Sequence, residues 1–412
     1  MPTINGERLI KNLKTLRDFG SIGNGTGVVR PSFSPVDLQA RHWLIERMSE
    51  AGLDASLDGV GNVIGRSRNA GKALLIGSHT DTQPTGGWLD GAMGVMYGLE
   101  VATALSEDPD TRHLPVDVAS WIDEEGTYVG MLGSSSFCDT LPVGVVEGAL
   151  SRSGVKLTDA MRDADVTDLP VARYDLDRYL GYMEAHIEQG PYLEAKQKRI
   201  GVVTSIIGMR DFDIEFSGQQ NHAGTTPMSL RKDAGAALLD YCHELRSRFP
   251  ELMGERTVFT IGQVQFFPGA PSIIPGKASM ILQFRDPDEG RLDRMAVLAQ
   301  QLAEELHRNG PVEVKFESRS NDSRAAHMDD SLQEYLAQAA ERHAPGLWER
   351  MLSGAAHDAQ ILARRMPASM LFVPSIGGVS HDFSENTLEE DIILGCQVMA
   401  SASAEILKTH NA

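Results

Sequence analysis

The chain has 412 residues, of which 42% are hydrophobic and 23% charged, as is ordinary for a soluble globular protein. A chain of this length is expected to fold as two domains rather than one. Its formal net charge of -19 argues against a nucleic-acid partner, which would require a basic face.

The composition also argues against a membrane protein and a disulfide scaffold. No stretch of 18 consecutive apolar residues occurs, so neither a transmembrane helix nor a membrane partner is expected. The first residues, "MPTINGERLIKNLKTLRDFG", lack the apolar core of a secretory signal. Cys138, Cys242 and Cys396 are too few and too scattered for a disulfide framework or a cysteine zinc site. We therefore expect a reducing, cytoplasmic setting.

The first half of the chain repeats a strand with a polar end and then a helix. Ser34 and Pro35 suit the N-cap and first position of a helix that runs to about Gly52. The run "KALLIGSH" predicts a buried parallel strand, and "GAMGVMYGLEVATALSED" predicts a helix of small residues. The runs "VDVASWIDEEG" and "GYMEAHIEQG" predict two further strands. This alternation predicts an α/β fold whose site lies at the carboxyl ends of the strands.

A different order of elements begins near residue 210. It reads strand, helix, strand, strand, helix, strand, in the runs "RDFDIEFSG", "SLRKDAGAALLDYCHELRSRF", "TVFTIGQVQFF", "KASMILQFRD", "GRLDRMAVLAQQLAEELHRNG" and "PVEVKFES". That order is the ferredoxin-like α+β plan. We therefore predict an inserted domain over residues 210–322, and a first domain made of residues 1–209 and 323–412.

Imidazole and carboxylate groups, the ligands that divalent transition metals take, follow several of these strands. The candidates are His79, Asp90, Glu125, His186 and His381. Glu124 adjoins Glu125, and two adjacent carboxylates in one turn cannot both point at one metal, so one is free for proton transfer. Taken singly, a histidine is more often structural, and an Asp-Gly pair is more often a turn. The joint pattern, beside glycines at strand ends, favours a metal site.

Several motifs carry a resemblance to a known family. They are "GVVRPSFSPVDLQAR", "GSHTDTQPTGGWLDGAMGV", "DEEG", "HIEQGPYLE", "NHAGTTPMSLRKDA", "SGAAHDA" and "FVPSIGGVSHDFSE", and they span residues 27–385. With them the chain resembles the metal-dependent amidohydrolases of the M20 type. Within that type it resembles the branch of N-carbamoyl-L-amino acid hydrolases, β-ureidopropionases and allantoate amidohydrolases. The resemblance implies a metallopeptidase-like catalytic domain with a mostly parallel sheet, plus an inserted lid domain through which two copies form a homodimer.

The resemblance also implies two divalent metal ions per subunit, with zinc or manganese expected and cobalt or nickel compatible. Asp90 would bridge the two ions. His79 and His186 would hold one ion, and Glu125 and His381 would hold the other.

Two further carboxylates receive roles from the same resemblance. Asp81 would accept the second ring N–H of His79 and so fix its tautomer. Glu124 would act as the general base, taking a proton from water and passing it to the leaving nitrogen.

Substrate contacts are implied for Gln189, His222, Ser272, Arg285 and Gly378. His222 would hydrogen-bond the oxyanion, and Gln189 would contact the ureido or amide group. Arg285 would pair with the substrate carboxylate, for which its planar fork is suited. Alternatives remain for two of them: a surface ion pair of Arg285 with Asp286 or Asp288, and a turn histidine at His222. His357, in "SGAAHDA", is expected to support a ligand or cap a helix rather than to act in catalysis.

Two positions depart from the branch and bear on the substrate. Ser272 stands in "GAPSIIPG" where the branch usually carries asparagine, and Tyr128-Val129 stand where it carries Arg-Phe. We expect hydrolysis of a linear C–N amide bond, most simply that of an N-carbamoyl-L-amino acid, which gives amino acid, carbon dioxide and ammonia. An N-acyl-amino acid amidase or dipeptidase with the same metal site is the alternative. A non-catalytic ligand-binding relative is a third hypothesis, although such relatives tend to lose a ligand or the base.

Overall fold

The computed structural model describes residues 2–23, 25–319 and 323–411. The chain divides into two compact units, a first unit of Met1–Thr204 with His327–Ala412 and an inserted unit of Ser205–Ala326. The predicted end of the insertion, at residue 322, lies outside the described residues. Within the described ranges, no helix combines the length and the apolar composition needed to cross a membrane.

A nine-stranded sheet forms the centre of the first unit. Its strands, in spatial order, are β1 (Asp54–Leu57), β2 (Val63–Arg66), β4 (Val116–Trp121), β3 (Ala73–His79), β5 (Tyr179–Ile187), β15 (Ala368–Val373), β6 (Ile200–Ile206) and β13 (Ala326–His327), with β14 (Trp348–Ser353) beside β6. The four central strands, β4, β3, β5 and β15, are parallel, and the pairs β1–β2, β2–β4 and β15–β6 are antiparallel. Every residue of β3, β4 and β15 is buried, as is typical of parallel strands covered on both faces. The predicted α/β class with a mostly parallel centre is confirmed.

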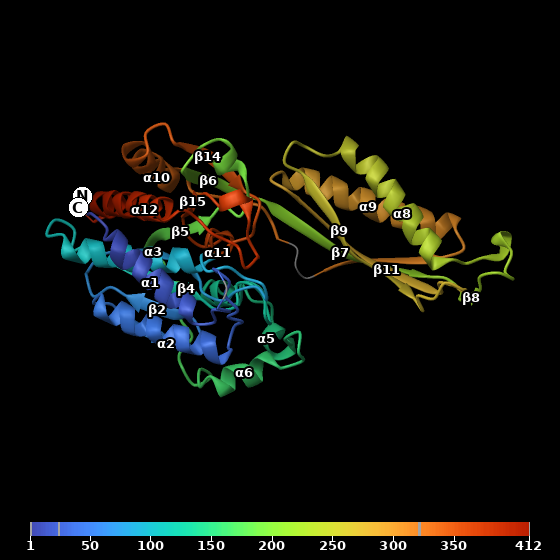
Figure 1. Ribbon diagram of the computed structural model, residues 1–412, viewed down its shortest axis with the longest axis horizontal. Coiled ribbons are helices and arrows are strands. Elements are labelled where there is room, and N and C mark those ends of the chain that lie inside the picture. Colours follow the sequence, from blue (N-terminus) through green and yellow to red (C-terminus); the bar gives the residue numbers. More distant parts are fainter. Residues whose placement is uncertain (1, 24, 320–322, 412) are drawn as a thin grey trace. The chain divides into compact units, whose positions relative to one another are not determined.

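The first unit also contains ten helices among its described residues. They are α1 (Gly6–Asp18), α2 (Pro35–Glu50), α3 (Ala92–Glu107), α4 (Leu132–Phe137), α5 (Val145–Gly148), α6 (Leu157–Asp163), α7 (Tyr192–Ala195), α10 (Asp330–His343), α11 (Asp358–Leu362) and α12 (Glu389–His410). A 3-10 turn, η3, covers Ile376–Gly378. The helices α3 and α12 pack on the parallel strands and on each other, while α4 and α11 contact β4, β5 and β15 (Figure 1). As predicted, Ser34 is the N-cap of α2, and its side chain accepts the Asp37 N–H.

The inserted unit holds a four-stranded antiparallel sheet. Its strands, in spatial order, are β12 (Glu313–Ser318), β7 (Gly208–Ser217), β11 (Lys277–Asp286) and β9 (Val258–Phe267). Two helices, α8 (Ala234–Arg248) and α9 (Glu289–Asn309), pack on the sheet (Figure 1). Shorter elements are β8 (Asn221–His222), β10 (Ile273–Ile274), η1 (Met228–Leu230) and η2 (Phe249–Glu251). Along the chain, the long elements follow the predicted order of strand, helix, strand, strand, helix, strand.

One boundary in the inserted unit differs from the predicted one. The helix expected from Ser229 begins only at Ala234, because the Asp233 side chain accepts the N–H groups of Gly235 and Ala236 and so caps it there. By contrast, α9 ends at Gly310 as expected.

Candidate functional site

The carboxyl ends of the parallel strands carry the predicted ligands. His79 is the last residue of β3, and His186 is the second-last residue of β5. Glu124 and Glu125 follow the end of β4, and Asp90 precedes α3. His381 lies in the loop after β15. An open parallel sheet places ligands outside this edge, because the connecting loops converge there.

Two groups of side chains there could each hold a metal ion, and both include Asp90. One consists of His79, Asp90 and His186, and the other of Asp90, Glu125 and His381, with the ligand atoms in each group within 4.8 Å of one another. Asp90 Oδ1 lies 3.0 Å from His186 Nε2 and 3.8 Å from His79 Nε2. Its other oxygen, Oδ2, lies 3.2 Å from His381 Nε2. The two oxygens of Asp90 therefore face different groups, which is the arrangement that a bridging carboxylate requires.

The electrostatics of these groups also suits cations. Burial raises the pKa of the Glu125 carboxyl to about 8, and the charge of Asp90 adds to this effect. Burial is the largest influence on His186 and lowers its pKa, but the hydrogen bond with Asp90 and the charges of Asp90 and Glu184 together outweigh burial and raise the pKa to about 9. The hydrogen bond to Asp90 likewise raises the pKa of His381 to about 9. Protons on these three side chains therefore neutralise part of the negative charge that is crowded here, and divalent cations would take over that role.

Glu124 lies beside the first group without belonging to either. Its Oε2 is 3.6 Å from His79 Nε2, and its side chain is 8% exposed. Burial, followed by the charges of Glu125 and Asp358, raises the pKa of Glu124 well above its ordinary value. A buried carboxylate with a raised pKa next to a metal group is suited to accept and return a proton.

The contact between His79 and Asp81 differs in detail from the expected one. His79 Nδ1 lies 3.0 Å from the Asp81 backbone oxygen but 3.7 Å from its carboxylate. The acceptor that fixes the tautomer is therefore the backbone carbonyl, and Nε2 is left for the metal group. The Asp81 carboxylate instead accepts the Glu125 backbone N–H at 3.1 Å. Asp81 thus links the loops that carry His79 and Glu125.

His357 and Gly91 support the two histidines of the first group. The ring of His357 lies 4.5 Å from that of His186, centroid to centroid, and its Nε2 is 2.9 Å from the Ser353 hydroxyl. His357 stands at the N-cap position of α11, but its side chain makes no cap hydrogen bond. Gly91 has a φ of +64°, and a Cβ there would lie 2.3 Å from His79 Nε2. Only glycine fits this position.

Gln189 reaches the second group. Its Nε2 lies 3.1 Å from Asp90 Oδ2, 3.2 Å from Ser380 Oγ and 3.4 Å from His381 Nε2. Gly378, also predicted to contact substrate, has a φ of +68°, and a Cβ there would lie 2.9 Å from Pro191 N. Gly378 therefore allows the loops after β5 and β15 to approach closely. Ser380 and Glu385 contact these groups without having been predicted as site residues, although both lie in the motif "FVPSIGGVSHDFSE".

His222, Ser272 and Arg285 belong to the inserted unit. His222 pairs with Ile273 in the β8–β10 ladder, and Ala223 N–H donates to the Ser272 carbonyl, so His222 and Ser272 lie on neighbouring segments. His222 Nδ1 accepts two backbone N–H groups, from Gly224 at 3.0 Å and from Thr225 at 3.2 Å. Its proton therefore sits on the exposed Nε2, which can donate.

Arg285 is the second-last residue of β11, and its Nε donates to Gln283 Oε1 at 3.0 Å. Burial lowers its pKa. The two carboxylates considered as alternative partners, Asp286 and Asp288, form ion pairs with Arg291.

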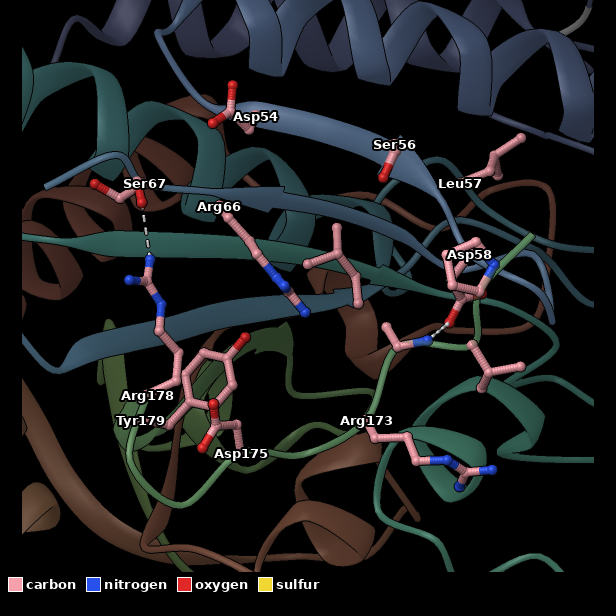
Figure 2. A pocket seen from close by; sticks show the side chains of 14 residues that line it. Asp54, Ser56, Leu57, Asp58, Arg66, Ser67, Arg173, Asp175, Arg178 and Tyr179 are labelled. Atoms are coloured by element: carbon pink, nitrogen blue, oxygen red, sulfur yellow. Dashed lines mark hydrogen bonds between the residues drawn. The ribbon is translucent and has the colours of Figure 1, made fainter.

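A cavity of about 710 Å³ opens elsewhere on the first unit, and none of the predicted site residues lines it (Figure 2). Most of its charged groups are already engaged. Asp54 pairs with Arg68, Arg173 with Asp139, and Arg178 with Asp117 and with the Ser67 carbonyl. This cavity is not part of the candidate metal site.

The chain is similar to known proteins over most or all of its length. Residues 75–405 match the model of peptidase family M20/M25/M40. The chain is 36% identical to an N-carbamoyl-L-amino acid amidohydrolase of Geobacillus stearothermophilus, over 96% of this chain and 97% of that protein. It is 31% identical to the allantoate amidohydrolase of Escherichia coli K12, over 95% of each chain. A solved amidase of the hydantoinase/carbamoylase family from Burkholderia phymatum superposes with a TM-score of 0.89, at 50% identity over 99% of each chain.

Proposed function

The chain belongs to peptidase family M20/M25/M40, and from that premise we propose that it hydrolyses the linear C–N amide bond of N-carbamoyl-L-amino acids. The products are the amino acid, carbon dioxide and ammonia. The observation that carries the proposal is the pair of metal-ligand groups that share Asp90, with Glu124 beside them. Relatives named for this reaction match over nearly their whole length.

The donor set fits two divalent ions, because imidazole nitrogens and carboxylate oxygens suit zinc, manganese, cobalt and nickel. His79 and His186 would hold one, Glu125 and His381 the other, and Asp90 both. When bound, such a pair of ions lowers the pKa of a water and polarises the carbonyl under attack.

Glu124 acts first as the general base and then as the general acid of the reaction. It takes a proton from the attacking water and later delivers it to the nitrogen that leaves. Burial, and after it the charges of the surrounding carboxylates, raise the pKa of Glu124, which favours its protonated form after the proton has been taken from water.

Recognition of the substrate falls to Gln189 and Gly378 in the first unit and to His222, Ser272 and Arg285 in the inserted unit. His222 Nε2–H donates to the oxyanion, as its Nδ1 contacts support. The Arg285 guanidinium pairs with the substrate carboxylate. Its pKa is lowered by partial burial and raised to a smaller extent by the charge of Asp211, so a carboxylate is compatible with its surroundings.

The distance between His222 and Arg285 supports a homodimer. Ser217 pairs with Lys277 at one end of β11, and His222 lies beyond that end, whereas Arg285 is eight residues further along the strand. At about 3.3 Å per residue, roughly 26 Å or more separates them. One small substrate cannot touch both in one copy, so a second copy must supply one of them.

The edge of the inserted sheet offers a surface for that second copy. β9 lies at the end of the strand order and exposes large apolar side chains, namely Val258, Val264, Phe266 and Phe267. An edge strand with unpaired backbone groups and exposed apolar residues favours pairing with its twin. We place the reaction in a reducing cytoplasm, in which free cysteines such as Cys138, Cys242 and Cys396 are usual.

The alternative function is an N-acyl-amino acid amidase or dipeptidase with the same metal residues. Ser272 favours it, because a hydroxyl replaces the amide that the branch usually carries near the substrate. Tyr128 favours it as well, since it replaces the usual arginine and packs edge-on against Phe33, with ring centroids 6.1 Å apart.

Product analysis separates these functions. The purified chain is stripped of metal, reloaded separately with manganese and zinc, and offered N-carbamoyl, N-acetyl and N-formyl amino acids, allantoate and dipeptides. Ammonia released together with a free amino acid from the carbamoyl substrate supports the proposal. Acid released from acyl substrates without ammonia indicates the amidase. No product from any substrate by the metal-loaded protein would favour a ligand-binding relative.

A further inference from the structure

Glu385 lies buried behind the residues proposed to hold the ions, with 0% of its surface exposed. Its Oε1 accepts the backbone N–H groups of Leu89 at 3.3 Å and Asp90 at 3.1 Å. Its Oε2 accepts the Ser380 hydroxyl at 2.8 Å. Three donors from two loops far apart in the sequence therefore converge on one carboxylate.

The loop before α3 is shaped around this carboxylate. A Cβ at Gly87 would lie 2.1 Å from Glu385 Oε1 and 2.5 Å from its Cβ, closer than nonbonded atoms can approach. Glycine at position 87 is thus what admits the Glu385 side chain. Trp88, the next residue, donates its indole N–H to Asn386 Oδ1 at 3.2 Å and holds the two loops together.

These contacts fix the direction of the next hydrogen bond. A carboxylate only accepts, so the single hydroxyl proton of Ser380 goes to Glu385. The Ser380 oxygen can then only accept, and its remaining neighbour is Gln189 Nε2 at 3.2 Å. Gln189 must therefore turn its NH₂ group toward Ser380, from where it also reaches Asp90 Oδ2 at 3.1 Å.

The opposite end of the Gln189 amide is left without a donor. Its Oε1 is buried and has no hydrogen-bond partner among the described residues. A buried acceptor without a partner costs free energy, so a donor that arrives with the ligand is favoured. Resting on the proposed function, we propose that Glu385 is a positioning residue that acts through Ser380 and makes Gln189 Oε1 the acceptor for the terminal NH₂ of a carbamoyl substrate.

Two variants and one matched control test this hydrogen-bond relay, which runs from Glu385 through Ser380 to Gln189. Ser380→Ala removes the relay hydroxyl, and Glu385→Gln introduces an amide donor that lets the Ser380 proton point at Gln189 and reverse its amide. Ser384→Ala is the control, because Ser384 is exposed on the same loop and its hydroxyl donates to Asp382, away from the relay. Each protein is assayed with the N-carbamoyl and the N-formyl derivative of one L-amino acid, which differ in the terminal NH₂. Metal content per subunit is measured alongside.

The expected result is a fall of roughly five- to tenfold in the carbamoyl-to-formyl ratio of kcat/KM in both variants, the scale of one lost hydrogen bond. Metal content and the ratio in Ser384→Ala should stay at wild-type levels. A ratio unchanged in both variants would overturn the proposal, as would an equal loss for both substrates with loss of metal. If the wild type binds the ureido compound without releasing ammonia, the proposed function fails. In that case the relay is tested by calorimetry, from the ratio of the dissociation constants of the carbamoyl and the formyl derivative. A ratio that is the same in both variants as in the wild type would overturn it.

Discussion

Replacing Glu124 by glutamine separates proton transfer from metal binding. The glutamine side chain has the shape of the native one but cannot take a proton from water. Glu124 belongs to neither ligand group, and its Oε2 lies 3.6 Å from His79 Nε2. Removal of a general base costs about 10²- to 10⁴-fold in rate, or roughly 2.7 to 5.5 kcal/mol of activation free energy. We expect kcat to fall by at least 10²-fold in Glu124→Gln.

Metal content distinguishes this effect from damage to the site. Glu124→Gln should bind the same number of ions as the wild type, and its metal-free form should be at least as stable, because one of several crowded carboxylates is gone. Glu125→Gln is the matched control and should lose metal as well as activity. The assay is product release with metal measured by plasma mass spectrometry. A Glu124→Gln enzyme that keeps more than a tenth of wild-type kcat, or that loses metal, would refute the role given to Glu124.

The same contacts lead to three further predictions, on pH, on Gly91 and on the edge of β9. Folding raises the pKa of the Glu125 carboxyl to about 8, so the folded metal-free protein binds a proton there that the unfolded chain releases at lower pH. The stabilisation by this proton is fully present below the carboxyl's ordinary pKa and is lost as the pH rises through 8. Metal must displace that proton, so the gain in melting temperature on adding manganese should grow from pH 6 to pH 8, and a constant gain would count against Glu125 as a ligand. Gly91→Ala should lower the metal content and should lower the free energy of unfolding by about 1–3 kcal/mol, because its Cβ would clash with His79 and its φ is left-handed. Gly148→Ala, which has open space around it, should change neither quantity, as measured by calorimetry and metal analysis. Phe266→Glu on the edge of β9 should convert the proposed homodimer to monomers in analytical ultracentrifugation, whereas Leu176→Glu, exposed on the first unit, should not.

The strands that carry the site could be predicted because their sequences carry strong local signals. The strand β3 begins with four apolar residues and ends in the polar residues Ser78 and His79, and β5 likewise begins apolar and has polar residues near its end, Glu184 and His186. A strand buried on both faces is mostly apolar, so the transition to polar residues indicates where it ends. The start of α2 could also be predicted, because Ser34 and Pro35 are typical of a helix N-terminus.

Other features depend on contacts between distant segments and leave no local signal. The carbonyl that accepts from His79 Nδ1 belongs to the backbone of Asp81, and any residue type there has such a carbonyl. The importance of Glu385 arises from donors at Leu89 and Asp90, almost 300 residues earlier. The β8–β10 ladder joins only two residues of each strand, too few for any periodic pattern.

Anomalous diffraction from crystals loaded with zinc or manganese would locate the bound ions and so test the two-ion site. We predict two anomalous peaks in each subunit. One should lie among His79, His186 and Asp90, and the other among Asp90, Glu125 and His381. A single peak, or an ion held by residues outside these two groups, would contradict the two-ion site on which the proposed hydrolysis depends.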